Sequence, residues 1–161
     1  MLDAGGDPEQ VRPAQEQARQ DVRVVVADMV RVGAVDDAVF AESRARALAR
    51  GGRSGRAIEA HLASRGVDAE RIHEAVQAAQ SEALDDPAQT ELAAALLQAR
   101  RRRIGPFSRH AQDDQPEAAQ ALRQRALAAL ARAGFSHDVA SSALDADLDT
   151  AEVLIARLRR V

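Results

Sequence analysis

The sequence has no cysteine, lysine, tryptophan or tyrosine, and only three phenylalanines in 161 residues. Without cysteine there are no disulfide bonds and no thiolate metal ligands, which fits a reducing compartment. Alanine supplies much of the 46% apolar content. Alanine favours helices but fills little volume. The composition therefore predicts thin contacts between helices rather than one deep core.

Long apolar runs are also absent, since none approaches the roughly 18 residues that a membrane-spanning helix needs. The first ten residues, MLDAGGDPEQ, lack the basic and apolar regions of a signal peptide. We therefore expect a cytoplasmic protein, monomeric and without a membrane partner.

What the sequence does contain is arginine, which accounts for all 22 basic side chains against a net charge of −3. A GC-rich coding sequence is enough to explain this bias. The physical consequence is independent of that origin, because guanidinium groups stay charged and present a planar fork that suits carboxylates and phosphates.

The apolar spacing is helical from Asp21 onward. Val22, Val25, Val26 and Met29 fall at i, i+3, i+4 and i+7, which is one face of a helix that Gly33 would end. Residues 1–20 are polar and rich in glycine and proline. We expect a disordered arm over 1–20 and a single helix over 21–33.

Residues 36–83 predict a bundle of three short helices. Asp36 is a suitable N-cap for the first, a glycine-rich turn over 51–55 ends it, Ser54 or Gly55 begins the second, and Asp68 begins the third after Gly66. Inward-facing residues of this bundle are predicted to include Phe40, Ala41, Ala45, Leu48, Ile58, Leu62, Ile72 and Val76.

Residues 86–161 repeat this order. Asp86 and Pro87 mark a helix start, and Pro106 cannot continue that helix. Further helices are predicted from Pro116, carrying Leu122 inward, from Ser136, and from Asp149 or Thr150. The junction LASRGVD at 62–68 recurs as LARAGFS at 130–136. Repeated helical units usually stack in series. The predicted fold is therefore all-α, with tandem three-helix bundles in an elongated, curved array.

Two arginine clusters are the candidate binding residues. One brackets the glycine turn and the other ends the helix before Ile104. Their members are Arg44, Arg46, Arg50, Arg53 and Arg56, and Arg100, Arg101, Arg102 and Arg103. Each cluster is compatible with two interpretations, a solvated helix end or a contact to carboxylates or phosphates of a partner. No aromatic side chain is interleaved with them, which disfavours base stacking.

The residues predict no enzyme, metal or cofactor. The pairs Asp36-Asp37, Asp85-Asp86 and Asp113-Asp114 stand at predicted helix starts, where aspartate caps exposed amides. Asp145, Asp147 and Asp149 alternate as in a calcium loop but lack its glycine and terminal glutamate. The four histidines show no metal-binding spacing, and no phosphate-loop or nucleophile motif is present.

Several of these segments resemble one family. GAVDDAVFAE at 33–42 is similar to the G-[YLI]-[LI]-[DN]-[DE]-x-x-[FY]-A-x segment of RecX, the bacterial regulator of the recombinase RecA. The junctions at 62–67 and 134–136 fit those of its second and third repeats, and RRIGPF at 102–107 resembles its basic R-R-x-G-P-[FY] loop. The resemblance covers about 22–144.

This resemblance implies a protein without catalysis, which binds RecA and lies along its filament on single-stranded DNA, restraining strand exchange, ATP hydrolysis and co-protease function. The arginines would also allow a weak contact to single- or double-stranded DNA. RecX proteins normally have three three-helix repeats. On that pattern 21–33 is the last helix of a truncated first repeat, 36–83 is the second repeat, and 86–161 is the third with a C-terminal helix. A misassigned start or a shortened member would each explain the truncation.

Two other hypotheses remain open. A small nucleic-acid-binding protein of helix-turn-helix type would place its second helix in a major groove. The helix after Asp68 offers Glu70, Glu74 and Gln77 there, with Arg71 as its base-reading cation. The third hypothesis is a truncated copy that folds poorly and melts without cooperativity.

Overall fold

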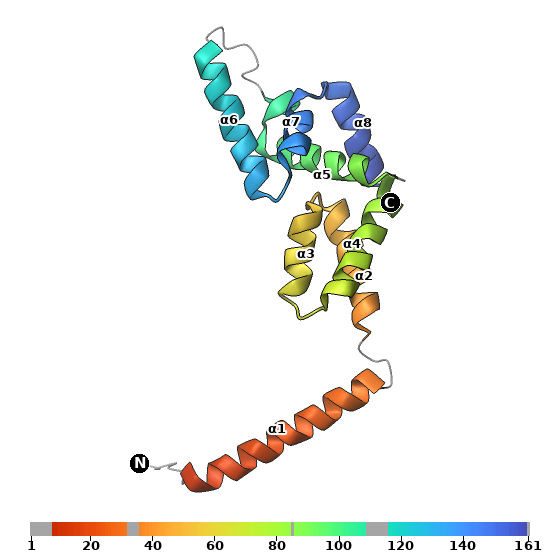
Figure 1. Cartoon of the computed structure of the whole chain (residues 1–161), viewed down its shortest axis with the longest axis vertical. Coiled ribbons are helices and arrows are strands. Elements are labelled where there is room, and N and C mark those ends of the chain that lie inside the picture. The colour runs from red at the N-terminus through yellow and green to blue at the C-terminus, as the bar shows by residue number, and fades with distance from the viewer. Residues whose placement is uncertain (1–7, 32–35, 85, 109–115, 161) are drawn as a thin grey trace, which may run out of the picture. The chain divides into compact units, whose positions relative to one another are not determined.

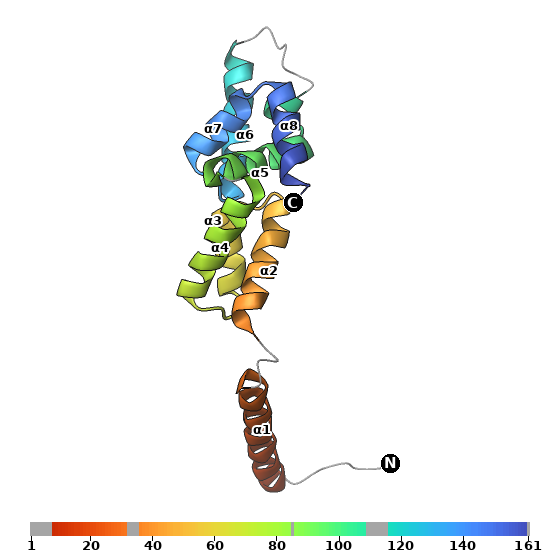
Figure 2. The same cartoon turned by 90° about the vertical axis from the view of Figure 1, so that its right-hand side faces the viewer.

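A computed structural model describes residues 8–31, 36–84, 86–108 and 116–160. All regular structure in these ranges is helical, without a strand (Figures 1 and 2). The prediction of an all-α fold is confirmed. Within the same ranges, no helix combines the length and apolar character that crossing a bilayer requires.

The chain divides into two units, 1–36 and 37–161. The described element of the first unit is α1 (Pro8–Arg31). We expected a disordered arm over 1–20, whereas the structure extends the helix back to Pro8. The alanine, glutamine, glutamate and arginine of 8–20 are good helix formers, and their propensity does not depend on burial. The predicted stripe Val22, Val25, Val26 and Met29 is 49–61% exposed.

The first three helices of the second unit are α2 (Asp37–Arg50), α3 (Gly55–Ala63) and α4 (Ala69–Leu84). They enclose one apolar cluster in which α2 packs on α4 and α3 contacts both (Figure 1). Its buried members are Ala41, Ala45, Ala49, Ile58, Leu62, Val67, Ile72, Ala75, Val76 and Ala79. Half of these are alanines, so the predicted thin helix-to-helix contact is observed here.

Phe40 corrects the predicted core, because 43% of this residue is exposed. The buried positions of α2 are Ala41, Ala45 and Ala49, spaced by four residues. Alanines at the contact allow α2 to approach α4 closely, and the phenylalanine ring one position away is left at the rim.

The rest of the unit consists of α5 (Pro87–Arg102), the short 3₁₀ helix η1 (Gly105–Phe107), α6 (Pro116–Arg132), α7 (His137–Asp145) and α8 (Leu148–Leu158). α5 contacts α7, α8 and the end of α4, and α6 packs on α7 (Figures 1 and 2). The second apolar cluster includes Leu96, Leu130, Phe135, Ile155 and Leu158, together with Ala83 and Leu84 from α4. Leu122 was expected to face inward but is 42% exposed, since α6 buries only later positions such as Ala126 and Leu130.

The helix ends follow the predicted capping residues. Ser54, Asp86 and Ser136 cap α3, α5 and α7, and the Asp68 carboxylate accepts from the Arg71 amide at the start of α4. The last helix begins earlier than predicted, because the Asp147 carboxylate accepts from the Thr150 amide at 2.8 Å. α5 ends before Pro106 is reached, since Arg103 takes the left-handed conformation with φ of 56°.

Candidate arginine-lined interface

The site forms where the start of α3 meets the end of α6. The Ser54 hydroxyl donates to the carbonyl oxygen of Ala133 at 2.8 Å and accepts from the Ala57 amide at 3.2 Å. Gly134 follows with φ of 94°, and a Cβ there would lie 2.4 Å from Ser54 Oγ. Glycine at 134 therefore sets how closely the two segments approach.

Polar contacts from α5 hold the same junction. Gln98 Nε2 donates to the Gly52 carbonyl at 2.8 Å, and an Arg101 guanidinium nitrogen donates to the Gly51 carbonyl at 2.9 Å. The Glu91 carboxylate accepts from the Gly55 amide at 3.0 Å. Partial burial raises the pKa of Glu91, opposed by the hydrogen bonds from Gly55 and Gln80.

Two adjoining hollows open along this junction. One is lined by Arg53, Arg56, Ala57, Ala60, Ala131, Arg132, Ala133 and Gly134, and the other by Gly52, Arg53, Gln98, Arg101, Arg102, Arg132 and Ala133. They share Arg53, Arg132 and Ala133, so they form one continuous surface. We call the surface carried by Arg53, Arg56, Arg101, Arg102 and Arg132 the arginine concavity.

The arginine concavity carries positive charge without internal compensation. Among the residues that the structure describes, no carboxylate lines either hollow. Within the described ranges, Arg53, Arg56, Arg102 and Arg132 form no ion pair, and the Arg101 contact is to a neutral carbonyl. Five exposed guanidinium groups from four segments therefore face solvent around one concave surface.

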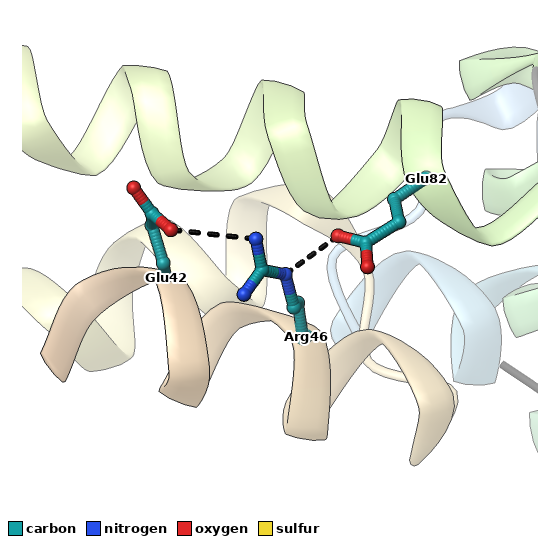
Figure 3. A network of polar contacts seen from close by, with 3 residues as sticks. All are labelled: Glu42, Arg46 and Glu82. Carbon is teal, nitrogen blue, oxygen red and sulfur yellow. Dashed lines mark hydrogen bonds and ion pairs between the residues drawn. The ribbon is translucent and has the colours of Figure 1, made fainter. Parts of the chain in front are cut away.

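Arg46 has different surroundings from these arginines (Figure 3). Its guanidinium lies between two carboxylates, with Nε 2.6 Å from Glu82 and a terminal nitrogen 3.3 Å from Glu42. Figure 3 shows Glu42 and Arg46 on one helix and Glu82 on the facing one, so this network links α2 to α4. Arg46 therefore stabilises the contact between α2 and α4, in addition to any role in binding a partner.

The other predicted arginines also lie outside the concavity. Arg44 Nε donates to His61 Nε2 at 3.1 Å. Partial desolvation, followed by the charges of Arg44, Arg65 and Arg53, lowers the pKa of His61. Arg50 lies beside Arg46 in a separate small hollow, and Arg100 pairs with Glu152 at 3.0 Å. The structure thus brings together Arg53, Arg56, Arg101 and Arg102 from two separate predicted clusters.

Arg132 is the residue that the sequence analysis missed. It ends α6, two positions before Gly134 in the recurring junction. Its place in that junction was the available signal, because the equivalent junction at 62–68 borders the first arginine cluster.

The acidic residues and histidines have structural explanations where they are described. Asp145 pairs with Arg123 through both carboxylate oxygens, at 2.5 and 2.8 Å, which lowers the pKa of Asp145. Asp147 caps α8. In the described ranges, histidines and carboxylates form no group of three that could hold a metal ion. The predicted pair at 113–114, Asp85 and His110 lie outside the described residues.

Fold and site together define an all-α protein with repeated three-helix units and a charged concave surface. Residues 36–76 match the family model for the second three-helix domain of RecX. This match coincides with α2, α3 and the first half of α4.

Two curated relatives carry the same name. Regulatory protein RecX of Myxococcus xanthus (strain DK1622) is 37% identical over 126 residues, which are 78% of this chain and 62% of that protein. Regulatory protein RecX of Agrobacterium fabrum is 29% identical over 147 residues, 91% of this chain and 70% of that protein. The family-model match and the two relatives together support a RecX family protein. The chain spans less than two thirds of the first relative, and no solved structure matches it.

Proposed function

We propose that the protein binds RecA and its filaments on single-stranded DNA and modulates, mainly by inhibition, the recombinase, ATPase and co-protease activities of RecA. This role belongs to DNA repair and the SOS response, in the cytoplasm. The observation that carries the proposal is the match of 36–76 to a RecX domain, together with two relatives named regulatory protein RecX.

The structure adds two supporting observations. The three-helix unit of α2–α4 packs against the α5–α8 group mainly through α4, so one compact unit presents surfaces from both. The conspicuous chemical feature of its described surface is a set of exposed arginines, which suits binding more than catalysis. We propose a monomer that regulates by contact, without an enzymatic activity of its own.

The test is the DNA-dependent ATPase of purified RecA, measured with this chain at several-fold molar excess over RecA. We expect lower steady-state ATP hydrolysis and slower strand exchange. The DNA must exceed the total binding capacity of both proteins, so that sequestration of DNA cannot imitate inhibition. Unchanged ATPase and strand exchange under these conditions would contradict the proposed function.

No contact among the described residues favours the helix-turn-helix alternative. On α4, which would be the recognition helix, Arg71 is paired with Asp68 at 2.9 Å, and Glu70 and Glu74 are exposed on the same helix. Acidic side chains on such a helix would repel the phosphates on either side of a major groove. We therefore do not propose sequence-specific duplex binding.

A further inference from the structure

The α2–α4 and α5–α8 halves of the second unit meet along an interface whose two edges differ in chemistry. On one edge α4 meets α5 and α8, and on the other the α2–α3 turn meets α5 and α6. We propose that the first edge is a hinge and the second a latch, and that repulsion between arginines on the two sides of the latch drives it open. This is a property of the chain alone, so its test is independent of the proposed function.

The hinge edge is apolar. Ala83 and Leu84, at the end of α4, are buried in the same cluster as Ile155 and Leu158 of α8. Exposing apolar surface of this kind to water is unfavourable. In Figure 1, α8 and α6 lie on opposite sides of α5, so this edge is separate from the latch edge. We therefore expect the two halves to stay in contact at the hinge edge when they move.

The latch edge consists mainly of hydrogen bonds to main-chain atoms. Gln98 and Arg101 of α5 donate to carbonyls of the α2–α3 turn at 2.8 and 2.9 Å. The Ser54 hydroxyl of the turn donates to the Ala133 carbonyl at 2.8 Å, and Leu97 adds an apolar contact with the turn. Each such hydrogen bond contributes little net free energy, because water can replace either partner. The latch edge is therefore the edge along which the halves separate.

Glu91 weakens the latch edge further. Its carboxylate accepts from the Gly55 amide at 3.0 Å and from the Gln80 side-chain amide at 3.1 Å, and both donors are neutral. In the described ranges it forms no ion pair, and the charged group that faces it is Glu59 of α3. Partial burial of a carboxylate without a cation is unfavourable. Opening returns this carboxylate to water, which offsets part of the hydrogen bonding that is lost.

Positive charges lie on both sides of the latch edge. Arg53 and Arg56 belong to the α2–α4 half, whereas Arg101, Arg102 and Arg132 belong to the α5–α8 half, and all five line the two adjoining hollows. In the described part of the chain, four of them form no ion pair, and Arg101 contacts a neutral carbonyl. Guanidinium groups keep their charge at physiological pH. Their mutual repulsion therefore favours separation of the two halves.

The expected response to salt has a definite direction. The screening length is about 30 Å at 0.01 M salt and about 3 Å at 1 M. Repulsion across the hollows is therefore strong at the lower concentration and largely lost at the higher one, so the latch should open at low salt and close at high salt. An interface held by surface ion pairs would respond in the opposite direction, because salt weakens such pairs.

A distance measurement between two spin labels tests the latch in the full chain. The sequence has no cysteine, so Ala63→Cys on α3 and Gln124→Cys on α6 supply the two labelling positions. Both residues are exposed, and neither lines a hollow. We expect double electron–electron resonance to show a short and a long distance, with a long-to-short ratio about threefold higher at 10 mM than at 1 M NaCl. A single distance at both concentrations, or more of the long distance at 1 M, would overturn the inference.

Arginine variants test the cause of opening. Arg56→Gln with Arg132→Gln removes one charge from each side of the latch edge. The control, Arg157→Gln with Arg160→Gln, removes two exposed charges near the end of α8 that form no ion pair in the described ranges. For the first pair we expect the long-distance population at 10 mM NaCl to fall about twofold or more. The control should leave it unchanged, and equal effects would show that only net charge acts, against the inference.

A variant of the latch itself tests the opposing hydrogen bonds. Gln98→Met keeps the side-chain volume but removes the donor to the Gly52 carbonyl, so the long-distance population should rise about twofold at both salt concentrations. The matched control is Gln77→Met, at an exposed position of α4, which should leave the distances unchanged. Unchanged distances in Gln98→Met would refute the latch.

Circular dichroism melting establishes that each variant is folded. The arginine variants remove no hydrogen bond or ion pair found in the described ranges, so they keep the inference testable should Gln98→Met unfold. RecA is absent from all of these measurements. A latch that fails them leaves the proposed function intact, and a chain that does not affect RecA can still show the latch.

Discussion

The two halves of the second unit, α2–α4 and α5–α7, repeat the same sequence of elements but differ where their helices end. After the first helix of each half, the chain reverses at Gly52 and at Arg103, with φ of 74° and 56°. After the second helix it reverses at Gly66 and Gly134. In all four cases the amide after the reversing residue donates to a carbonyl five residues earlier, as in a Schellman motif.

Glycine is present at these chain reversals for two different reasons. At Gly52 a Cβ would lie 2.9 Å from the Leu97 side chain, and at Gly134 it would lie 2.4 Å from Ser54 Oγ. At Gly66 no atom lies within 4 Å of that position. Gly66 therefore serves backbone conformation alone, whereas Gly52 and Gly134 also allow the two halves to touch. Arginine at 103 shows that a left-handed helix end by itself tolerates a side chain.

The largest difference in stability is expected when a methyl group is added at the two glycines that follow the second helix of each half. Gly134→Ala combines left-handed strain with displacement of the buried Ser54 hydroxyl from Ala133, and should reduce the free energy of unfolding by about 3 kcal/mol. Gly66→Ala adds strain alone and should cost about 1 kcal/mol. Urea denaturation followed by circular dichroism measures both, and equal losses would refute the distinction.

A smaller effect of opposite sign is expected at the end of α5. Arg103→Gly relieves the strain of a left-handed arginine but adds freedom to the unfolded chain, so the net gain should be about 0.5 kcal/mol. The control is Arg102→Gly, which places glycine at the last helical position and should destabilise. A loss of stability at Arg103→Gly would mean that its side chain contributes more than its backbone costs.

The smallest effect concerns the contact between the halves and depends on pH. Burial raises the pKa of Glu91, so its folded-state pKa lies above the unfolded one. The folded protein therefore binds the proton more tightly, and the contribution of Glu91 to stability improves as pH falls through the raised pKa towards the unfolded value. Glu91→Gln cannot titrate.

The difference in unfolding free energy between the Glu91→Gln variant and the natural sequence should accordingly shift in favour of the natural sequence as the pH is lowered from 7 to 4.5. Denaturation at both pH values measures it. Because both proteins share the same other carboxylates, their losses in acid cancel. A difference that is constant with pH would show that Glu91 is not desolvated.

Most helix boundaries could be predicted because their signals are local. Asp86 with Pro87, Ser136, Gly66 and Gly134 act through their own backbone or side chain within a few residues. Phe40 and Leu122 could not be placed this way, since their exposure depends on which face of α2 and α6 meets a neighbour. Helical periodicity predicts which positions share the apolar face of a helix. It does not predict which of them lie at the border of that face and stay exposed.

The site was only half predictable for the same reason. Both arginine clusters were visible in the sequence. The sequence did not show which of these arginines pair with carboxylates and which line the concavity. Arg46 finds its carboxylate on Glu82, 36 residues away, while Arg53 and Arg102 meet around a junction formed with α6. Which arginines are neutralised and which stay available is decided by tertiary contacts that leave no local pattern.

One helix, α4, contributes to the apolar clusters of both repeats, so the repeats are not independent of each other. α4 gives Ala79 to the first apolar cluster and Ala83, one turn later, to the second. Fraying of this helix would open both clusters at once, so the second unit should melt as a single cooperative block. Dividing the chain near residue 85 would thus yield two fragments with uncovered apolar faces.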